Sequence, residues 1–232
     1  MVRLKEALHL GPLMFQAVGV HGPELTPLAH AAMNVLLVTV TFALLFAGRR
    51  PHRSVVAGLA TLVVVVAALR VLLQPLPNVQ PVTVAALLIG SHLGARRGAA
   101  FAVLVALLSN LLIGDGWWTL FQALGWAGVA WLGSRLVFEN ERGFAMAPLV
   151  IASFASAFLF GFTTNLSLVE PGMTVGGFIH LVYLGLPFDL VHAFGNVAFA
   201  LWLGPALHRF LRDVRAMEGC VQPVGDVHVV HG

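Results

Sequence analysis

The sequence predicts an all-α integral membrane protein, and its composition carries that prediction. Hydrophobic residues make up 59% of the 232 residues, and 24 glycines add to this apolar share. Charged residues make up only 10%, so a soluble exterior would have almost no charge to keep it dissolved. The apolar residues occur in long runs, which is typical of helical spans and not of the alternating strands of a membrane barrel.

Seven apolar segments, separated by turn residues and charges, are expected to be membrane helices. In chain order they are Pro27–Ala47, Ser54–Leu73, Val79–Ala95, Gly98–Ile113, Trp118–Val137, Phe144–Val169 and Leu186–Phe210. The third and fourth are short for a span of about 20 residues, so they are expected to stand untilted or to be capped by loops.

The two ends of the chain carry weaker signals. Residues 7–20 are apolar but short, and they are expected to form an interfacial helix or a re-entrant segment. Val175–Phe210 is too long for one crossing, and Gly185-Leu186-Pro187 is expected to divide it into an outer helix and a spanning helix. Residues 213–232 are expected to form a polar, irregular cytoplasmic tail.

Basic residues predict the orientation in the membrane. Most of them fall in alternate loops, at Arg49, Arg50, Arg53, Arg96, Arg97, Arg135, Arg142, Arg209, Arg212 and Arg215. Because basic residues resist translocation, these loops are expected to be cytoplasmic, with the N-terminus outside and the C-terminus inside a cell membrane. The net charge is only +3, and the clusters are explained by topology, so no nucleic-acid partner is expected.

Apart from the arginines at the cytoplasmic ends of the segments, two charged residues fall within the predicted spans, Arg70 and Asp189. A charge inside the bilayer costs at least about 2.5–3.5 kcal/mol on insertion scales. One interpretation is that Arg70 extends to the outer headgroups and Asp189 caps the helix after Pro187. The other is that they pair with each other, or with a ligand, in an outward-facing cavity.

A polar and aromatic cluster is expected on the same, outer side. Each of its members is individually explained by interhelical hydrogen bonding or by the aromatic belt, but together they suit a flat, heteroaromatic solute. Tryptophans would stack on this solute, amides would bind its polar edge, and Asp189 would accept from it or hold Arg70. The candidate residues are Gln80, Asn110, Trp117, Trp118, Gln122, Trp126, Asn165, Asp189, His192 and Asn196.

Catalytic and nucleotide-binding motifs are absent from the sequence. It contains no GxSxG, no HExxH, no phosphate loop and no paired carboxylates. His30, His92, His180 and His192 show no ligand spacing, so neither a cofactor nor a catalytic residue is predicted. An intramembrane haem or metal enzyme and a non-transporting membrane scaffold remain as alternatives to solute capture.

Several motifs together resemble a known family. They are Val79-Gln-Pro-Val-Thr83, Gly94-Ala-Arg-Arg-Gly98, Gly116-Trp-Trp-Thr-Leu-Phe-Gln122 and Leu186-Pro-Phe-Asp-Leu-Val-His192 with Gly195-Asn196. In order and spacing they are similar to the substrate-binding S components of energy-coupling factor transporters for vitamins. The Gly-Trp-Trp and Asn-Val-Gln-Pro patterns are nearest to members assigned to cobalamin or corrinoid precursors.

This resemblance implies a six-helix solute-binding domain over residues 54–212. It also implies a transmembrane coupling subunit and two cytoplasmic ATPases as partners, with ATP used only by those ATPases. Residues 1–50, an interfacial segment and an extra transmembrane helix, depart from a minimal S component. The small residues Ser54, Ala57, Gly58 and Thr61 fall where the coupling helix of the family would lie, although internal helix packing also explains them.

Overall fold

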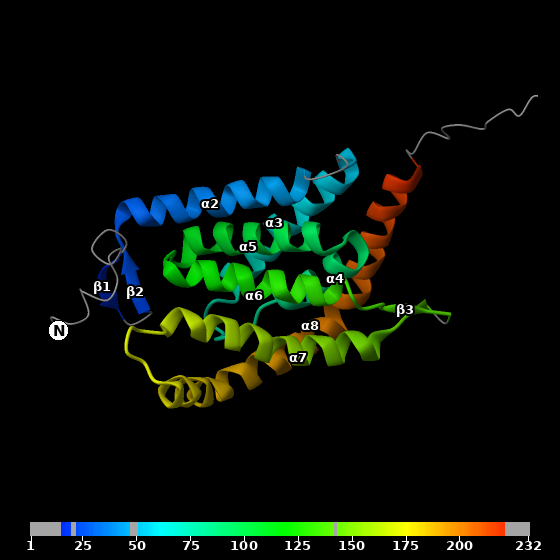
Figure 1. Ribbon diagram of the computed structural model, residues 1–232. Helices are drawn as coiled ribbons and strands as arrows, with labels where there is room; N and C mark the ends of the chain where they lie inside the picture. The colour runs from blue at the N-terminus through cyan, green and yellow to red at the C-terminus, as the bar shows by residue number, and fades with distance from the viewer. Residues whose placement is uncertain (1–14, 20–21, 47–50, 142, 221–232) are drawn as a thin grey trace, which may run out of the picture.

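The computed structural model describes residues 15–19, 22–46, 51–141 and 143–220. These residues form seven α-helices that lie roughly side by side (Figure 1). The helices are α2 (Pro27–Phe46), α3 (Arg53–Leu72), α4 (Val82–Leu93), α5 (Ala95–Ile113), α6 (Trp117–Gly133), α7 (Met146–Asn165) and α8 (Val175–Cys220). A 3-10 turn, η2 (Leu166–Leu168), follows α7, and two small hairpins pair β1 (Phe15–Gly19) with β2 (Gly22–Leu25) and β3 (Glu139–Asn140) with β4 (Gly143–Phe144).

Five of these helices, α2, α3, α5, α7 and α8, are long and apolar enough to cross a membrane. Helix α4 is also apolar but has only 12 residues. Each of the seven predicted apolar segments overlaps one of the helices. The prediction of an all-α protein with several membrane-spanning helices is confirmed at this level.

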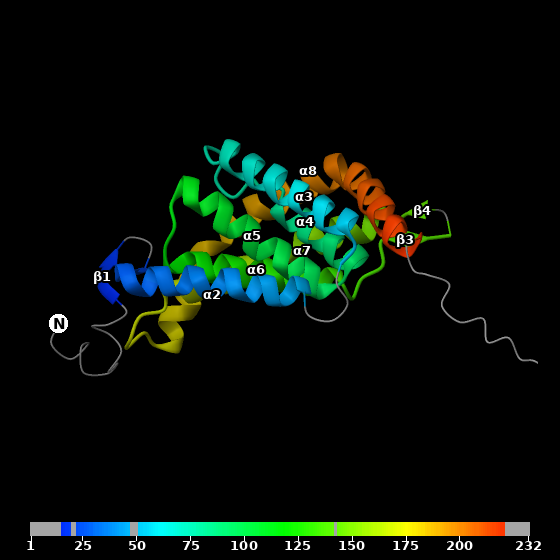
Figure 2. The same cartoon turned by 90° about the horizontal axis from the view of Figure 1, so that it is seen from above.

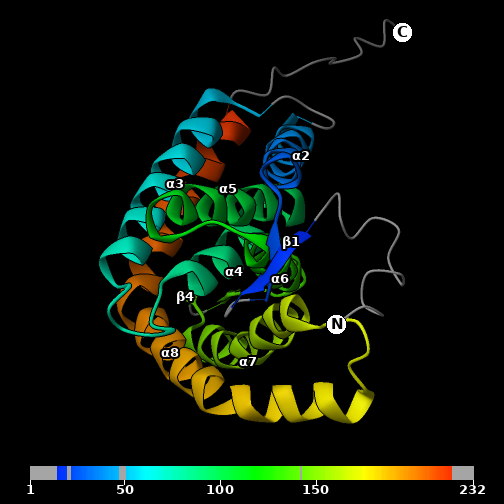
Figure 3. The ribbon, with the colours of Figure 1, turned by 90° about the vertical axis from the view of Figure 1, so that its left-hand side faces the viewer.

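Helix α4 lies at the centre of the bundle, and every residue from Val82 to Gly90 is buried. The end-on view shows α4, α5 and α6 in the middle, with α2, α3, α7 and α8 around them (Figure 3). Seen from above, α2 runs along the outside of the bundle (Figure 2). The outer helices expose large apolar side chains, including Phe42, Val64, Ile151 and Trp202, as expected of surfaces that face lipid.

Helices α4 and α6 approach each other closely because each has a glycine at the crossing. A Cβ atom added to Gly90 would overlap the carbonyl oxygen of Ala130, and one added to Gly133 would overlap the carbonyl oxygen of Leu87. Close backbone approach increases the van der Waals contact that holds membrane helices together. The small-residue crossing of this bundle is therefore between α4 and α6.

Helix α8 differs from the prediction. The helix is continuous from Val175 to Cys220 and contains Pro187 and Pro205, so the expected division at Gly185-Leu186-Pro187 is wrong. Proline removes one hydrogen bond from a helix and bends it, but neighbouring helices can hold the bent helix together in a membrane. Figure 1 shows α8 changing direction along its length.

Two further corrections concern the ends of the chain. Residues 15–19 form a strand that pairs with Gly22–Leu25, and they are not part of an interfacial helix. Strand pairing satisfies the backbone hydrogen-bonding groups of a segment that is too short for a stable helix.

The first eight residues of the predicted tail are helical and not irregular. Val214 is buried and packs against Gly58, and Glu218 forms two 2.7 Å hydrogen bonds with Arg97. The remaining predictions for residues 1–14, Arg49, Arg50, Arg142 and 221–232 lie outside the described residues.

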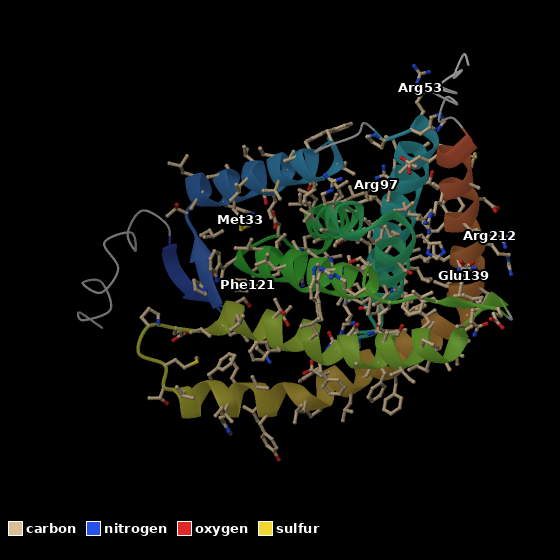
Figure 4. The ribbon with its side chains drawn as sticks, turned by 45° about the vertical axis from the view of Figure 1, so that its right-hand side comes forward. Met33, Arg53, Arg97, Phe121, Glu139 and Arg212 are labelled. Carbon is tan, nitrogen blue, oxygen red and sulfur yellow. The ribbon has the colours of Figure 1, made fainter. Side chains whose placement is uncertain are left out.

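The two ends of the bundle differ in charge. Arginines mark one end, where Figure 4 shows Arg53, Arg97 and Arg212 towards the right of the molecule. At this end His208 joins helix α8 to the rest of the bundle, with Nδ1 3.1 Å from His92 Nε2 and Nε2 3.2 Å from a carboxylate oxygen of Glu139. The opposite end of the bundle holds the C-termini of α3, α5 and α7 and the N-terminus of α6.

We expect Gly133→Ala to destabilise the protein by about 1–3 kcal/mol, the usual cost of forcing extra atoms into a packed interior. Gly128 provides a matched control on the same helix, because the nearest atom to an added Cβ is 3.9 Å away. Thermal unfolding in mild detergent measures both variants. Equal melting temperatures for Gly133→Ala and Gly128→Ala would contradict the close α4–α6 crossing.

Candidate functional site

A cavity of about 340 Å³ opens at the end of the bundle opposite the arginines. Its walls come from the last turns of α3, α5 and α7, from the start of α6 and from η2. It combines one cation, several amides and hydroxyls, an indole and a few aliphatic side chains. The lining residues are Arg70, Asn110, Ile113, Gly114, Trp118, Gln122, Thr164, Asn165, Ser167 and Leu168.

Arg70 is the central polar residue of this cavity, and only 5% of it is exposed. Its Nε atom donates to Gln80 Oε1 at 2.7 Å, and its Nη2 atom donates to Gln122 Oε1 at 3.1 Å. Its Nη1 atom donates to Asn110 Oδ1 at 2.6 Å and also to the hydroxyl of Ser109. Residues of the α3–α4 loop, of α5 and of α6 thus hold the guanidinium in place.

Aromatic and dipolar groups also favour the cation at this position. The guanidinium carbon of Arg70 lies 5.1 Å from the centre of the Trp126 ring, which is within range of a cation–π interaction. Arg70 also lies in the last turn of α3, where the helix dipole favours a positive charge. All the hydrogen-bond acceptors of Arg70 are neutral, so no carboxylate balances its charge directly.

The expected ion pair between Arg70 and Asp189 is not formed. In the part of the chain that the structure describes, Asp189 forms no side-chain hydrogen bond and no ion pair, and only 8% of it is exposed. Its carboxylate lies against Gly161 of α7, where a Cβ atom would overlap it. The two residues are separated because Arg70 turns towards α5 and α6, whereas Asp189 on α8 faces α7.

A second set of hydrogen bonds continues from Asn110 away from the cavity. Its Nδ2 atom donates to Gln122 Oε1 at 2.8 Å and to Thr119 Oγ1 at 2.7 Å, and Thr119 donates to Asp115 Oδ1 at 2.6 Å. The other carboxylate oxygen of Asp115 lies 2.7 Å from both His30 Nε2 and Asn34 Nδ2. Asp115 thereby joins the α5–α6 loop to α2.

The hydrogen bonds of Asp115 change its acidity. Burial alone would raise the pKa of this carboxyl group, but the hydrogen bonds from Thr119, Asn34 and His30 outweigh burial and lower the pKa. The ionised form of Asp115 is therefore the form that stabilises the loop.

Other donors on the cavity wall have no partner among the described residues. Gln122 accepts two hydrogen bonds at Oε1, from Arg70 and Asn110, and its amide nitrogen donates to none of the described residues, so both of its N–H groups are available. The side-chain amide of Asn165 makes no hydrogen bond within the described residues, and its nitrogen lies next to Gly185. The wall can therefore donate hydrogen bonds to a bound molecule.

The structure divides the residues predicted for the site into two groups. Asn110, Trp118, Gln122 and Asn165 line the cavity, together with Arg70. Gln80 lies behind it as a partner of Arg70. The other predicted residues, which do not line the cavity, are Trp117, Trp126, Asp189, His192 and Asn196.

Four of those other residues make contacts within the bundle. Trp126 is fully buried and stacks on Phe160 with ring centres 4.4 Å apart, and Trp117 packs edge-on against Phe121 at 5.1 Å. His192 Nε2 lies 3.1 Å from the Thr83 hydroxyl, and Asn196 donates to the carbonyl of Ser153 at 3.1 Å. Neither these tryptophans nor these α8 residues reach a solute in the cavity.

The proposed coupling face on α3 is also divided by the structure. Gly58 is buried, and a Cβ atom there would lie 3.0 Å from Val214 of α8, so this residue serves internal packing. Ser54 is half-buried and lies 2.8 Å from His52 Nδ1. Ala57 and Thr61 are exposed and remain available to a partner.

Sequence reasoning missed several polar residues of the site, namely Ser109, Thr119, Thr164 and Ser167. Ser109 and Thr119 complete the environment of Arg70 and Asn110, whereas Thr164 and Ser167 line the wall at the end of α7. Small hydroxyl residues are common in membrane helices as donors to their own backbone. The sequence could have identified these hydroxyl residues because each lies within about one helical turn of a predicted site residue.

Comparison with known proteins places the fold and the cavity within one family. Residues 50–214 match the model of DUF6580, a family of unknown function. The chain belongs to this family. The matched region runs from α3 into α8, so it includes every residue of the cavity wall. No curated protein and no solved structure matches the chain.

Acid should destabilise the protein through Asp115. Because the pKa of Asp115 is lowered by folding, its contribution to stability is present above the unfolded-state pKa of about 3.9 and is lost as the pH falls through the folded-state pKa. We expect the melting temperature of the wild type to fall more steeply below about pH 4 than that of Asp115→Asn.

Exposed Glu170, in the loop after η2, provides a matched control as Glu170→Gln. Its acid profile should follow the wild type. Parallel profiles for Asp115→Asn and the wild type between pH 3 and pH 7 would contradict the assigned role of Asp115.

Proposed function

We propose that this protein is the membrane-embedded, solute-binding subunit of an ATP-driven importer, as its resemblance to S components implies. The observation that carries the proposal is the cavity of about 340 Å³ with its buried arginine and free amides. A buried cation and unpaired donors are costly to a fold, so residues held in this way favour a binding function over a purely structural one. No catalytic residue and no cofactor is assigned to this chain.

The direction of capture follows from the proposed orientation. Arg53 and Arg97 lie at the start of α3 and α5, whereas Arg70 and Asn110 lie in the last turns of the same helices. If the arginine-rich end is cytoplasmic, as the positive-inside rule favours, the cavity opens to the outside. The protein would then take its solute from outside the cell membrane.

Energy would come from partner subunits, because the sequence contains no nucleotide-binding motif. We propose a transmembrane coupling subunit and two cytoplasmic ATPases as these partners. Exposed small residues allow another helix to approach closely, and Ala57 and Thr61 on α3 present such a surface. The proposed contact with the coupling subunit is therefore limited to Ala57, Thr61 and neighbouring exposed positions.

The size of the cavity restricts the solute. Pockets for drug-sized ligands usually measure about 300–1,000 Å³, and this cavity is at the lower limit. A corrinoid is too large for it, so a small vitamin-like molecule with one or two rings is the better candidate. Trp118, Ile113 and Leu168 offer apolar surface for such a ring.

The alternatives to solute capture have less support. No group of three or more potential metal ligands occurs in the described ranges, and His92 and His208 are occupied by each other and by Leu88 and Glu139. A membrane scaffold has no need for a buried cation beside a cavity. Neither alternative is favoured by a specific observation.

Mass spectrometry of small molecules that co-purify with the full chain in mild detergent tests the proposal. We expect one solute in roughly equal amount to the protein, and at least a tenfold lower amount in Trp118→Ala and Gln122→Ala. These two substitutions remove cavity contacts from residues that are only partly buried, so the fold should survive.

Trp202→Ala is the control, because Trp202 is 74% exposed and lies on α8, away from the cavity wall. It should retain the solute as well as the wild type does. Equal retention in all four proteins would contradict the site. An empty wild type that no small vitamin stabilises against thermal unfolding would contradict solute capture.

A further inference from the structure

We propose that the cavity selects solutes that carry a carboxylate group, and that Arg70 and Gln122 together bind this group. The inference rests on the proposed function, because it names the chemical class of the captured solute. It is carried by the charge balance of the cavity and by the unused donors of the residues that line it.

The charge balance comes first. Arg70 is buried, and all of its hydrogen-bond acceptors belong to amides or to a hydroxyl. No aspartate or glutamate is among the residues that line the cavity. Removing a cation from water costs several kcal/mol unless an opposite charge accompanies it. The empty cavity therefore has an excess positive charge at its wall.

The nearest carboxylate in the hydrogen-bond network does not neutralise this charge. Asp115 is connected to Arg70 only through Thr119 and Asn110. Both of its oxygens already accept hydrogen bonds, from Thr119 on one side and from His30 and Asn34 on the other. Asp189, the other buried carboxylate considered for this role, faces Gly161 on α7. The counter-ion of Arg70 must come from outside the described protein.

The free donors are arranged to receive such a counter-ion. A guanidinium has five N–H groups, and four of them are used by Gln80, Ser109, Asn110 and Gln122. The remaining N–H is on Nη2, the same atom that donates to Gln122. The amide group of Gln122 that accepts from Nη2 also carries two further N–H groups on its nitrogen. Donors on two adjacent groups match the two oxygens of one carboxylate.

A carboxylate fits this site better than a phosphate does. One carboxylate neutralises the single charge of Arg70, whereas a phosphate dianion would leave one negative charge without a cation among the residues that line the cavity. The remaining wall includes Trp118, Ile113 and Leu168, which suits the apolar or aromatic body of an organic acid. The expected solute is thus a small aromatic or heteroaromatic acid.

Matched pairs of acids and amides test the selection. Isothermal titration calorimetry with the full chain in mild detergent would compare nicotinate with nicotinamide, 4-aminobenzoate with 4-aminobenzamide, and indole-3-acetate with indole-3-acetamide. These probes are similar in shape and differ in charge. We expect at least one acid to bind, with an affinity at least tenfold higher than that of its amide.

The variant Gln122→Glu supplies an internal counter-ion to Arg70 with almost no change in volume. It should raise the melting temperature above that of the wild type and weaken acid binding at least tenfold. Gln74→Glu is the control, since exposed Gln74 in the α3–α4 loop receives the same chemical change outside the cavity wall. It should change neither quantity.

The outcomes separate this inference from the proposed function. Amides that bind as tightly as acids, or a neutral solute that co-purifies with the protein, would overturn carboxylate selection and leave solute capture standing. A melting temperature of Gln122→Glu at or below that of the wild type would also overturn it. Protein that binds no probe and carries no co-purified solute would overturn both.

Discussion

A buried guanidinium without an adjacent carboxylate is the constraint on which the cavity and its surrounding helices depend. Arg70 is stable in its position only if neutral oxygens replace water around it. These oxygens come from Gln80, Ser109, Asn110 and Gln122, which lie on the α3–α4 loop, α5 and α6. Because each acceptor must point inward, the rotation of α5 and α6 about their axes is fixed by a residue of α3.

This arrangement links the stability of the bundle to its proposed function. An amide whose oxygen accepts from Arg70 keeps its nitrogen free for another partner. The oxygen of Gln122 accepts from Arg70 and Asn110, and its nitrogen donates to none of the described residues. The same set of contacts thus satisfies the cation and leaves donors for a solute. Trp126 supports Arg70 from the protein side, so the tryptophan most buried in the bundle acts by positioning the arginine.

The two ends of the protein are stabilised in different ways. In the core of the bundle, close packing of α4 against α6 at Gly90 and Gly133 holds these two helices together. At the arginine-rich end, the ion pair of Arg97 with Glu218 joins α5 to α8. At the opposite end, polar residues from α3, α5, α6 and α7 meet around the cavity of about 340 Å³, which faces one side of the proposed membrane.

The sequence by itself determined the helical class, the presence of helices apolar enough to span a membrane and the approximate chain positions of the seven helices, because a long apolar run is a local property of the chain. It also placed five residues of the site at the same end of the bundle, because successive spans run in opposite directions and the end of one lies beside the start of the next. These residues are Arg70, Asn110, Trp118, Gln122 and Asn165. Only the tertiary structure decided which polar residues reach the cavity and which pack inside, as Trp126, Asp189 and Asn196 do. The reason is that lipid and the protein interior are both apolar, so hydrophobic periodicity does not tell which face of a membrane helix points inward.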